Sequence, residues 1–115
     1  MKNLLTLFLF LVTIGVAQAQ NAQVDPIRDR AHQQAVRMQK VVALTPEQTT
    51  KVEEIFFQRA TAVEAVNNNA ALSPEQKAAE VAKIKREKET ELQAVLTPEQ
   101  YQKYQEMREE RKKGK

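Results

Sequence analysis

The chain contains no cysteine and no tryptophan among its 115 residues, and it has only two glycines. Without cysteine there is no disulfide framework, no thiolate metal site and no residue for lipid attachment. One glycine, Gly15, lies near the N-terminus, and the other is Gly114. The sequence between them therefore offers no glycine-rich loop that could cradle a phosphate group.

The side chains of hydrolytic catalysis are equally scarce. The chain has one serine, Ser73, one histidine, His32, and two aspartates, Asp25 and Asp29. Ser73 fits the role of a helix cap and lies far from His32 in sequence, so no acyl-transfer triad can be assembled. Glutamates are frequent, but they alternate with Lys and Arg on polar faces. We therefore expect a protein that is not an enzyme, with no catalytic residue and no cofactor.

Residues 1–19 have the pattern of a secretory signal peptide. Lys2 supplies the positive charge, residues 4–16 form the apolar stretch, and Ala17-Gln18-Ala19 is a small-x-small cleavage site. The alternative is an uncleaved membrane anchor, but the apolar stretch is shorter than the roughly 20 residues that a span needs. We expect cleavage after Ala19, a flexible N-terminus at 20–24, and a soluble protein in the periplasm with no membrane span.

The net charge restricts the class of partner to be expected, and the small number of large apolar residues restricts the size of the core. The net charge of +3 is too small to indicate nucleic-acid binding, and export argues against it further. Beyond the signal, the only aromatic residues are Phe56, Phe57, Tyr101 and Tyr104. The core must be thin, and apolar stripes on long helices would need a second protomer to cover them.

One five-residue phrase occurs three times, at 44–48, 72–76 and 96–100, as Leu-Thr/Ser-Pro-Glu-Gln. In each copy the hydroxyl residue can cap a helix, proline suits the first helical position, and glutamine can complete a capping box. Each proline disfavours the α conformation of the residue before it, so an upstream helix must end or bend there. Asp25-Pro26 repeats the same logic. The sequence predicts an all-α fold of about four helices.

The predicted helical domain covers 25–107, with helices that start at Pro26, Pro46, Pro74 and Pro98. The first helix should end near Val42, and Asn67-Asn68-Asn69 should end the second because asparagine tolerates the left-handed conformation. Apolar residues recur at helical spacing in the two long helices, and Lys88 interrupts the second stripe. The stripes comprise Val52, Ile55, Phe56, Val63 and Val66, then Val81, Ile84, Leu92 and Val95.

Residues 108–115 form a basic tail, containing Arg108, Arg111, Lys112, Lys113 and Lys115. We expect a solvated end. The alternative is a contact with an anionic envelope surface or an acidic sensor domain.

Phe57 is a candidate contact for a client or partner protein. It falls far from the centre of the second helix's apolar stripe, so that stripe cannot bury it. Either the dimer interface or a neighbouring helix covers Phe57, or clients do.

The first predicted helix supplies further candidate contacts, in which arginine stems and an adaptable methionine accompany apolar residues. They are Ile27, Arg28, Arg30, Arg37, Met38 and Lys40. The alternative is that Ile27 and Met38 belong to the core and that the basic residues form a solvated rim.

A metal site was also considered, since Asp25, Asp29 and His32 fall on one side of the first helix. No second histidine or cysteine completes the ligand shell, so a solvated polar face is favoured and no metal ligand is assigned.

The three phrases, the signal peptide and the helical pattern together resemble the LTxxQ family of periplasmic stress proteins, the group of Spy, CpxP and the zinc-resistance-associated proteins. The resemblance extends from about Pro26 to Tyr104. It implies bent helical hairpins that form an antiparallel, cradle-shaped homodimer. It also implies that the phrase residues lie at helix junctions and have a structural role: Leu44, Thr45, Gln48, Leu72, Ser73, Gln76, Leu96, Thr97 and Gln100.

The function implied by this resemblance is that of an ATP-independent chaperone, a holdase that binds unfolded or misfolded envelope proteins and suppresses their aggregation. The alternative within the family is a regulatory partner of a membrane stress-sensor kinase. Three phrases instead of two, and Ser73 in the middle copy, depart from the family pattern. Tails rich in histidine or methionine are absent, so a metal-responsive protein is the poorer match. A helical structural protein of the envelope also stays open.

Overall fold

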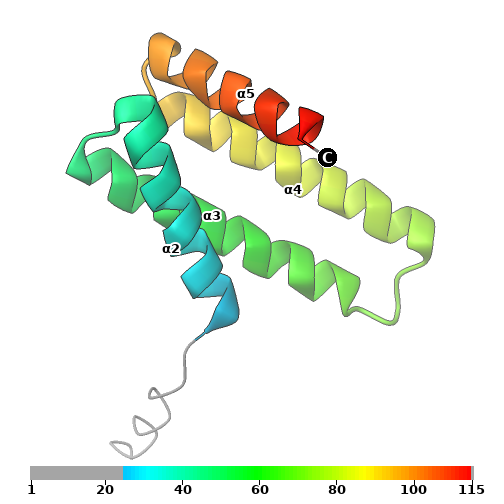
Figure 1. Cartoon of the computed structure of the whole chain (residues 1–115). Helices are drawn as coiled ribbons and strands as arrows, with labels where there is room; N and C mark the ends of the chain where they lie inside the picture. The colour runs from blue at the N-terminus through cyan, green and yellow to red at the C-terminus, as the bar shows by residue number, and fades with distance from the viewer. Residues whose placement is uncertain (1–24, 115) are drawn as a thin grey trace, which may run out of the picture.

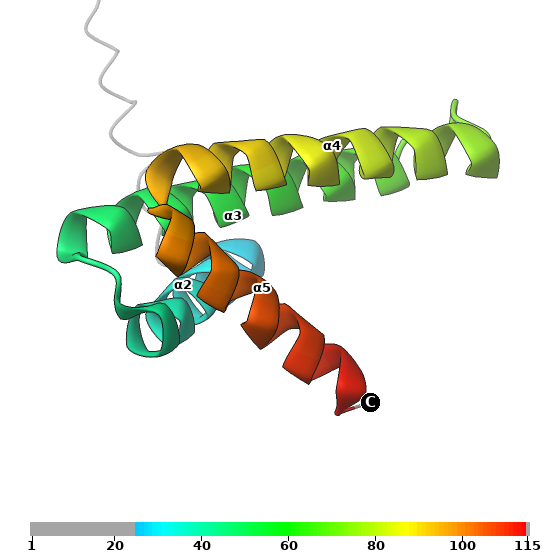
Figure 2. The same ribbon diagram turned by 90° about the horizontal axis from the view of Figure 1, so that it is seen from above.

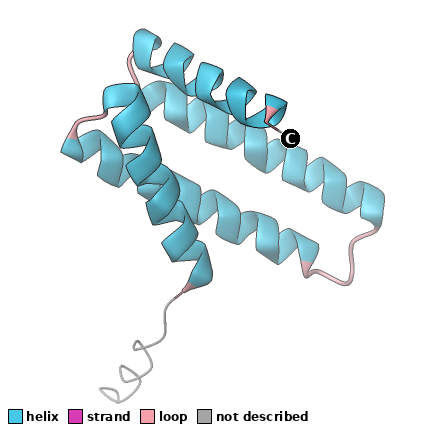
Figure 3. Ribbon diagram, viewed as in Figure 1, coloured by secondary structure: helices cyan, strands magenta, loops and turns pink. Residues whose placement is uncertain are grey.

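The computed structural model describes residues 25–114, which form four α-helices, one short π-helical segment and no strand (Figures 1 and 3). The elements are α2 (Pro26–Met38), η3 (Gln39–Ala43), α3 (Pro46–Asn67), α4 (Pro74–Val95) and α5 (Pro98–Lys113). The all-α prediction is confirmed. Among these helices, none has both the length and the apolar character to cross a membrane. The predicted signal peptide at 1–19, the predicted flexible segment at 20–24 and Lys115 lie outside the described residues.

The two longest helices, α3 and α4, run side by side in opposite directions (Figure 1). Seen from above, α2 and α5 both lie on one side of this pair, near the end where α3 begins and α4 stops (Figure 2). The other end of the α3–α4 pair extends beyond them. One half of the pair is therefore covered, and the other half is only two helices thick.

All three repeated phrases start helices through the predicted capping box. The hydroxyl oxygens of Thr45, Ser73 and Thr97 accept from the backbone N–H three residues later, at 3.0 to 3.1 Å. The glutamine side chain at that later position accepts in return from the backbone N–H of the capping residue. Proline occupies the first turn in each case. The capping boxes predicted for the three phrases are therefore confirmed.

Two of the three phrases also contact each other. Gln48 Nε2 donates to the backbone carbonyl of Val95 at 3.0 Å, and Gln100 Nε2 donates to the backbone carbonyl of Ala43 at 3.1 Å. The two side-chain amides also lie within hydrogen-bond distance of each other, at 2.7 and 3.0 Å. Each glutamine therefore caps its own helix and binds the chain that enters the other junction. Gln76, at the far turn, makes only its own capping box.

The ends of two helices differ from the sequence prediction in detail. The first helix continues to Ala43 as expected, but its last five residues form the π-helical segment η3, closed by a bond from Leu44 N to Gln39 O at 3.3 Å. Ala43, with φ of 65°, is the one described residue with positive φ. Helix α3 ends at Asn67, within the asparagine run as predicted, but the left-handed conformation expected there is not observed. Asn68 has φ of −92°, and the Asn69 side chain instead accepts from Ala71 N.

The buried core lies at the covered end of the α3–α4 pair. It includes residues from every helix together with two leucines of the repeated phrases: Ala31, Ala35, Met38, Val42, Leu44, Val52, Phe56, Leu92, Leu96 and Tyr104. Of the predicted stripe residues beyond this core, Ile84 is buried, while Val63, Val66 and Val81 are only half-buried. The stripe positions were predicted correctly, but α2 and α5 are too short to cover the distal half.

An ion-pair cluster joins α3 to α4 at the edge of this core. The Arg59 guanidinium donates to Glu91 at 3.0 Å and to Glu87 at 3.1 Å. Its hydrogen bond lowers the pKa of Glu91. Arg59, which interrupts the apolar stripe of α3, thus finds its partners on the neighbouring helix.

Helix α5 extends to Lys113, through most of the segment expected as a basic tail. The expectation of a solvated end is wrong for Arg108, which is half-buried and donates to Glu89 of α4 at 2.6 Å. The physical reason is that Arg108 lies one turn beyond the buried Tyr104, on the same face of the helix.

We predict that Gln48→Ala lowers the free energy of unfolding by about 2 kcal/mol, because it removes a cap and leaves a part-buried carbonyl without its donor. Gln76→Ala is the matched control and should cost about 0.5 kcal/mol, since it removes a capping box alone. Urea unfolding monitored by circular dichroism measures both values. Equal losses in the two variants would contradict the structural role of the paired junction.

Candidate functional site

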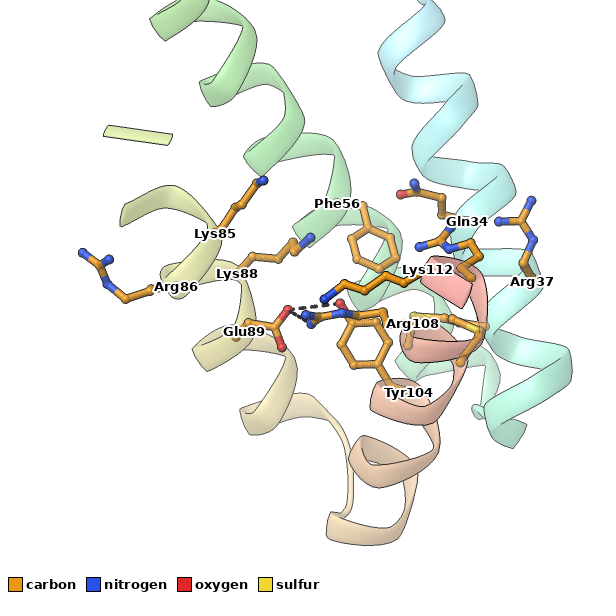
Figure 4. A pocket seen from close by; sticks show the side chains of 13 residues that line it. Gln34, Arg37, Phe56, Lys85, Arg86, Lys88, Glu89, Tyr104, Arg108 and Lys112 are labelled. Carbon is orange, nitrogen blue, oxygen red and sulfur yellow. Dashed lines mark hydrogen bonds and ion pairs between the residues drawn. The ribbon is translucent and has the colours of Figure 1, made fainter. Parts of the chain in front are cut away.

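A groove of about 550 Å³ lies between α2, α4 and α5 (Figure 4). Its lining combines apolar residues of the core edge with many cations and a single carboxylate: Gln34, Arg37, Met38, Phe56, Lys85, Arg86, Lys88, Glu89, Tyr104, Met107, Arg108, Arg111 and Lys112. The groove exists because the paired junction holds α5 beside η3 while α2 packs on α3. It is the most distinctive surface of the described chain.

The only acidic lining residue is already saturated with donors. Glu89 accepts from Tyr101 Oη at 2.7 Å, from Tyr104 Oη at 3.1 Å and from Arg108 Nη1 at 2.6 Å. Burial and the negative charge of Glu89 raise the pKa of Tyr104 to about 12. Burial also raises the pKa of Tyr101, followed by its hydrogen bond to Glu89 and the negative charge of that residue. Glu89 therefore ties α5 to α4, and its single negative charge, which is paired with Arg108, is outnumbered by the cations of the groove.

Lys88 is the cation that lies deepest at the apolar floor. Its side chain runs from α4 toward the Phe56 ring, and Nζ lies 5.8 Å from the ring centroid (Figure 4). Burial lowers the pKa of Lys88, with a smaller opposing effect from Glu89. Within residues 25–114, no carboxylate lies within the 4.0 Å of an ion pair with Nζ. The lysine that interrupts the predicted stripe thus places a charge beside apolar surface.

The rim of the groove is exposed and basic. It comes from all three bordering helices: Arg37, Lys85, Arg86, Arg111 and Lys112. In Figure 4 the Lys112 side chain reaches inward toward Glu89, whereas Arg86 points away from the other labelled residues. A groove with cations above an apolar floor can attract acidic segments from a distance and hold apolar groups after contact.

A second hollow lies between the start of α2 and the end of α3. It is lined by Asp25, Pro26, Ile27, Arg30, Ala60, Val63, Glu64, Asn67 and Asn68. It carries two carboxylates, Asp25 and Glu64, and one cation, Arg30, so it lacks the excess of positive charge found in the groove.

The candidate contacts predicted from α2 do not form one surface. Arg37 and Met38 line the groove, although Met38 is only 1% exposed and belongs mainly to the core. Ile27 and Arg30 line the second hollow. Lys40 is exposed on η3. Of the two alternatives for Met38, membership of the core is the one observed, since the side chain is 1% exposed and belongs to the core cluster.

Arg28 and Phe57 contact each other. The Arg28 guanidinium carbon lies 3.8 Å from the centroid of the Phe57 ring, and the same side chain reaches Glu53 and Glu54. Of the alternatives for Phe57, a neighbouring helix covering the ring is the one observed. The pair contributes to the packing of α2 on α3.

The residues considered for a metal have other partners. Asp25 caps α2, Asp29 accepts from Gln33, and His32 Nδ1 lies 2.8 Å from Glu53. Among the described residues, no group of three or more histidine and acidic side chains is placed to hold a metal ion.

Sequence reasoning missed the groove residues of α4 and α5, chiefly Lys88, Glu89 and Arg108. The available signals were the lysine within an apolar stripe and the basic end of the last helix. Neither signal shows that these two features meet, because that depends on the turn at Leu96.

No family model, curated protein or solved structure matches the chain. Membership of the LTxxQ family therefore stays a prediction that rests on the repeated phrases.

The pKa of Tyr104 predicts a distinct alkaline titration. The chain has two tyrosines, and Tyr104 should ionise near pH 12, well above the usual 10.0. Because the folded state holds the proton more tightly, stability is full below about pH 10 and falls as the pH rises toward 12. Absorbance of the phenolate measures this, and Tyr104→Phe should remove the late phase. A single transition near pH 10 for both tyrosines would contradict the burial beside Glu89.

Proposed function

We propose that this chain is an ATP-independent holdase of the LTxxQ type, which binds unfolded envelope proteins and suppresses their aggregation in the periplasm. The observation that carries the proposal is the groove, in which an open basic rim surrounds an apolar floor. Unfolded polypeptides expose acidic and apolar side chains together, and a shallow site of this composition can hold many of them without demanding one sequence.

The structure of the core supports the same proposal. The core cluster lies at one end of the molecule, and the half-buried Met107 borders the groove. Methionine adapts its shape to different apolar partners, so such a floor suits promiscuous binding. The rim cations supply attraction that weakens as salt is added.

A second candidate function is binding to the periplasmic domain of a membrane stress-sensor kinase. The observation that favours it is the exposed basic end of α5, with Arg111, Lys112 and Lys113 in its last turn. An acidic sensor domain would complement that charge. In a pull-down, a regulator of this kind should capture one dominant partner, whereas a holdase should capture many unfolded proteins.

We predict that the purified protein lowers light scattering by a chemically unfolded client in the absence of nucleotide. Reversing two rim charges, Arg111→Glu with Lys112→Glu, should abolish most of the protection, because the groove then repels acidic segments. The matched control reverses two exposed charges away from the groove, Lys83→Glu with Lys103→Glu. Unchanged scattering with the wild-type protein would reject the holdase, and equal effects of both double variants would reject the groove as its site.

We also propose a homodimer, in which a second copy covers the half-buried valines of the distal α3–α4 pair. These valines have only two helices around them, and an apolar surface of this kind favours association. Sedimentation velocity should give a dimer at micromolar concentration, dissociating on dilution. A monomer at every concentration tested would rule this out.

A further inference from the structure

We propose that the groove between α2, α4 and α5 is also a binding site for a single anionic amphiphile, a molecule with one negatively charged head group and a hydrocarbon tail. The head group would lie at Lys88 and the tail along the outer edges of Phe56, Tyr104 and Met107. This ligand site is independent of the holdase proposal, although both use the same groove.

The first step of the argument is the imbalance of charge in the lining. The lining contains one carboxylate, Glu89, and seven cationic side chains: Arg37, Lys85, Arg86, Lys88, Arg108, Arg111 and Lys112, of which Arg86 points away from the others. Glu89 forms an ion pair with Arg108, and one carboxylate cannot neutralise the six other cations. A ligand that carries negative charge would lower the mutual repulsion of these cations.

The second step is the position of Lys88. Its ammonium group lies between the exposed rim and the Phe56 ring, with no carboxylate of the described chain in ion-pair contact. A charge held in partly apolar surroundings is costly unless it is paired. An anionic head group at this point would provide the partner that the protein does not, and burial would strengthen the contact.

The third step is the floor. Four apolar or aromatic side chains line this part of the groove on the α2, α3 and α5 sides, and the half-buried Met107 can adapt to a flexible tail. The volume of about 550 Å³ lies within the range of roughly 300–1,000 Å³ that is typical of small-molecule sites. An inorganic anion would leave this floor unused, and an uncharged or cationic amphiphile would leave the cations unpaired. A ligand with both parts uses the whole groove.

The chain offers a direct probe of this site. It has three methionines, and the two within the described residues, Met38 and Met107, both line the groove. With methionine labelled at the methyl carbon, dodecanoate added below its micellar concentration should shift both of these signals and saturate at one molecule per groove. Calorimetry under the same conditions gives the affinity.

Two further ligands and three variants make the test specific. Butanoate has the head group without the tail, and dodecyltrimethylammonium has the tail with the opposite charge. Each should bind at least about tenfold more weakly than dodecanoate. Lys88→Met should also weaken dodecanoate binding by at least about tenfold, while Lys88→Arg retains it. Lys103→Met, on the exposed side of α5, is the matched control and should bind as the wild type does.

Lys88→Met replaces a half-buried charge with an apolar side chain of similar length, so the variant should fold, and its circular-dichroism spectrum checks this. Absence of methyl shifts, equal binding of dodecyltrimethylammonium, or unchanged affinity in folded Lys88→Met would overturn the ligand site. Dodecanoate binding by a protein that fails to protect unfolded clients would reject the holdase alone. Protection without dodecanoate binding would reject the ligand site alone.

Discussion

The contact between Gln48 and Gln100 holds the two halves of this fold together. Both side chains cap their own helices, and both then donate to the carbonyl that ends the opposite incoming segment. Buried or half-buried carbonyls need a donor, and here each junction supplies the donor for the other. Phrases 52 residues apart in sequence therefore act as one structural unit.

The position of the groove follows from that unit. The junction fixes where α5 leaves α4 and where α3 leaves η3, so the basic face of α5 comes to lie opposite α2. Glu89 then ties α5 to α4 through the two tyrosines and Arg108. Cations from three helices converge over a small apolar floor. The same arrangement leaves the distal α3–α4 pair thinly covered, which gives the molecule a compact end and an extended one.

The helices could be predicted closely from sequence because their starts are encoded locally. Thr45, Ser73 and Thr97 are each followed by proline and by the glutamine that completes the box, all within four residues. The contact between Gln48 and Gln100 could not be predicted in this way, since the Gln76 copy forms the same capping box and makes no such contact. The difference lies in which helix ends meet, and that is a property of the tertiary fold.

The groove was harder to predict for the same reason. In the sequence, Lys88 only interrupts an apolar stripe, and Arg108 only begins a basic segment. Their helices come together because of the turn at Leu96, which the local sequence does not relate to either residue. Neither composition nor spacing predicts the π-helical turn that ends at Ala43. Ala43 has a positive φ, which alanine seldom adopts.

A double-mutant cycle between Gln48 and Gln100 tests the central claim most directly. Each glutamine is replaced by alanine alone and together, and the free energies of unfolding are compared. If the two amides form one unit, the pair shows a coupling energy of about 1 kcal/mol or more. Losses that add to within about 0.3 kcal/mol would show that the junctions act independently, and the account of the fold would be contradicted.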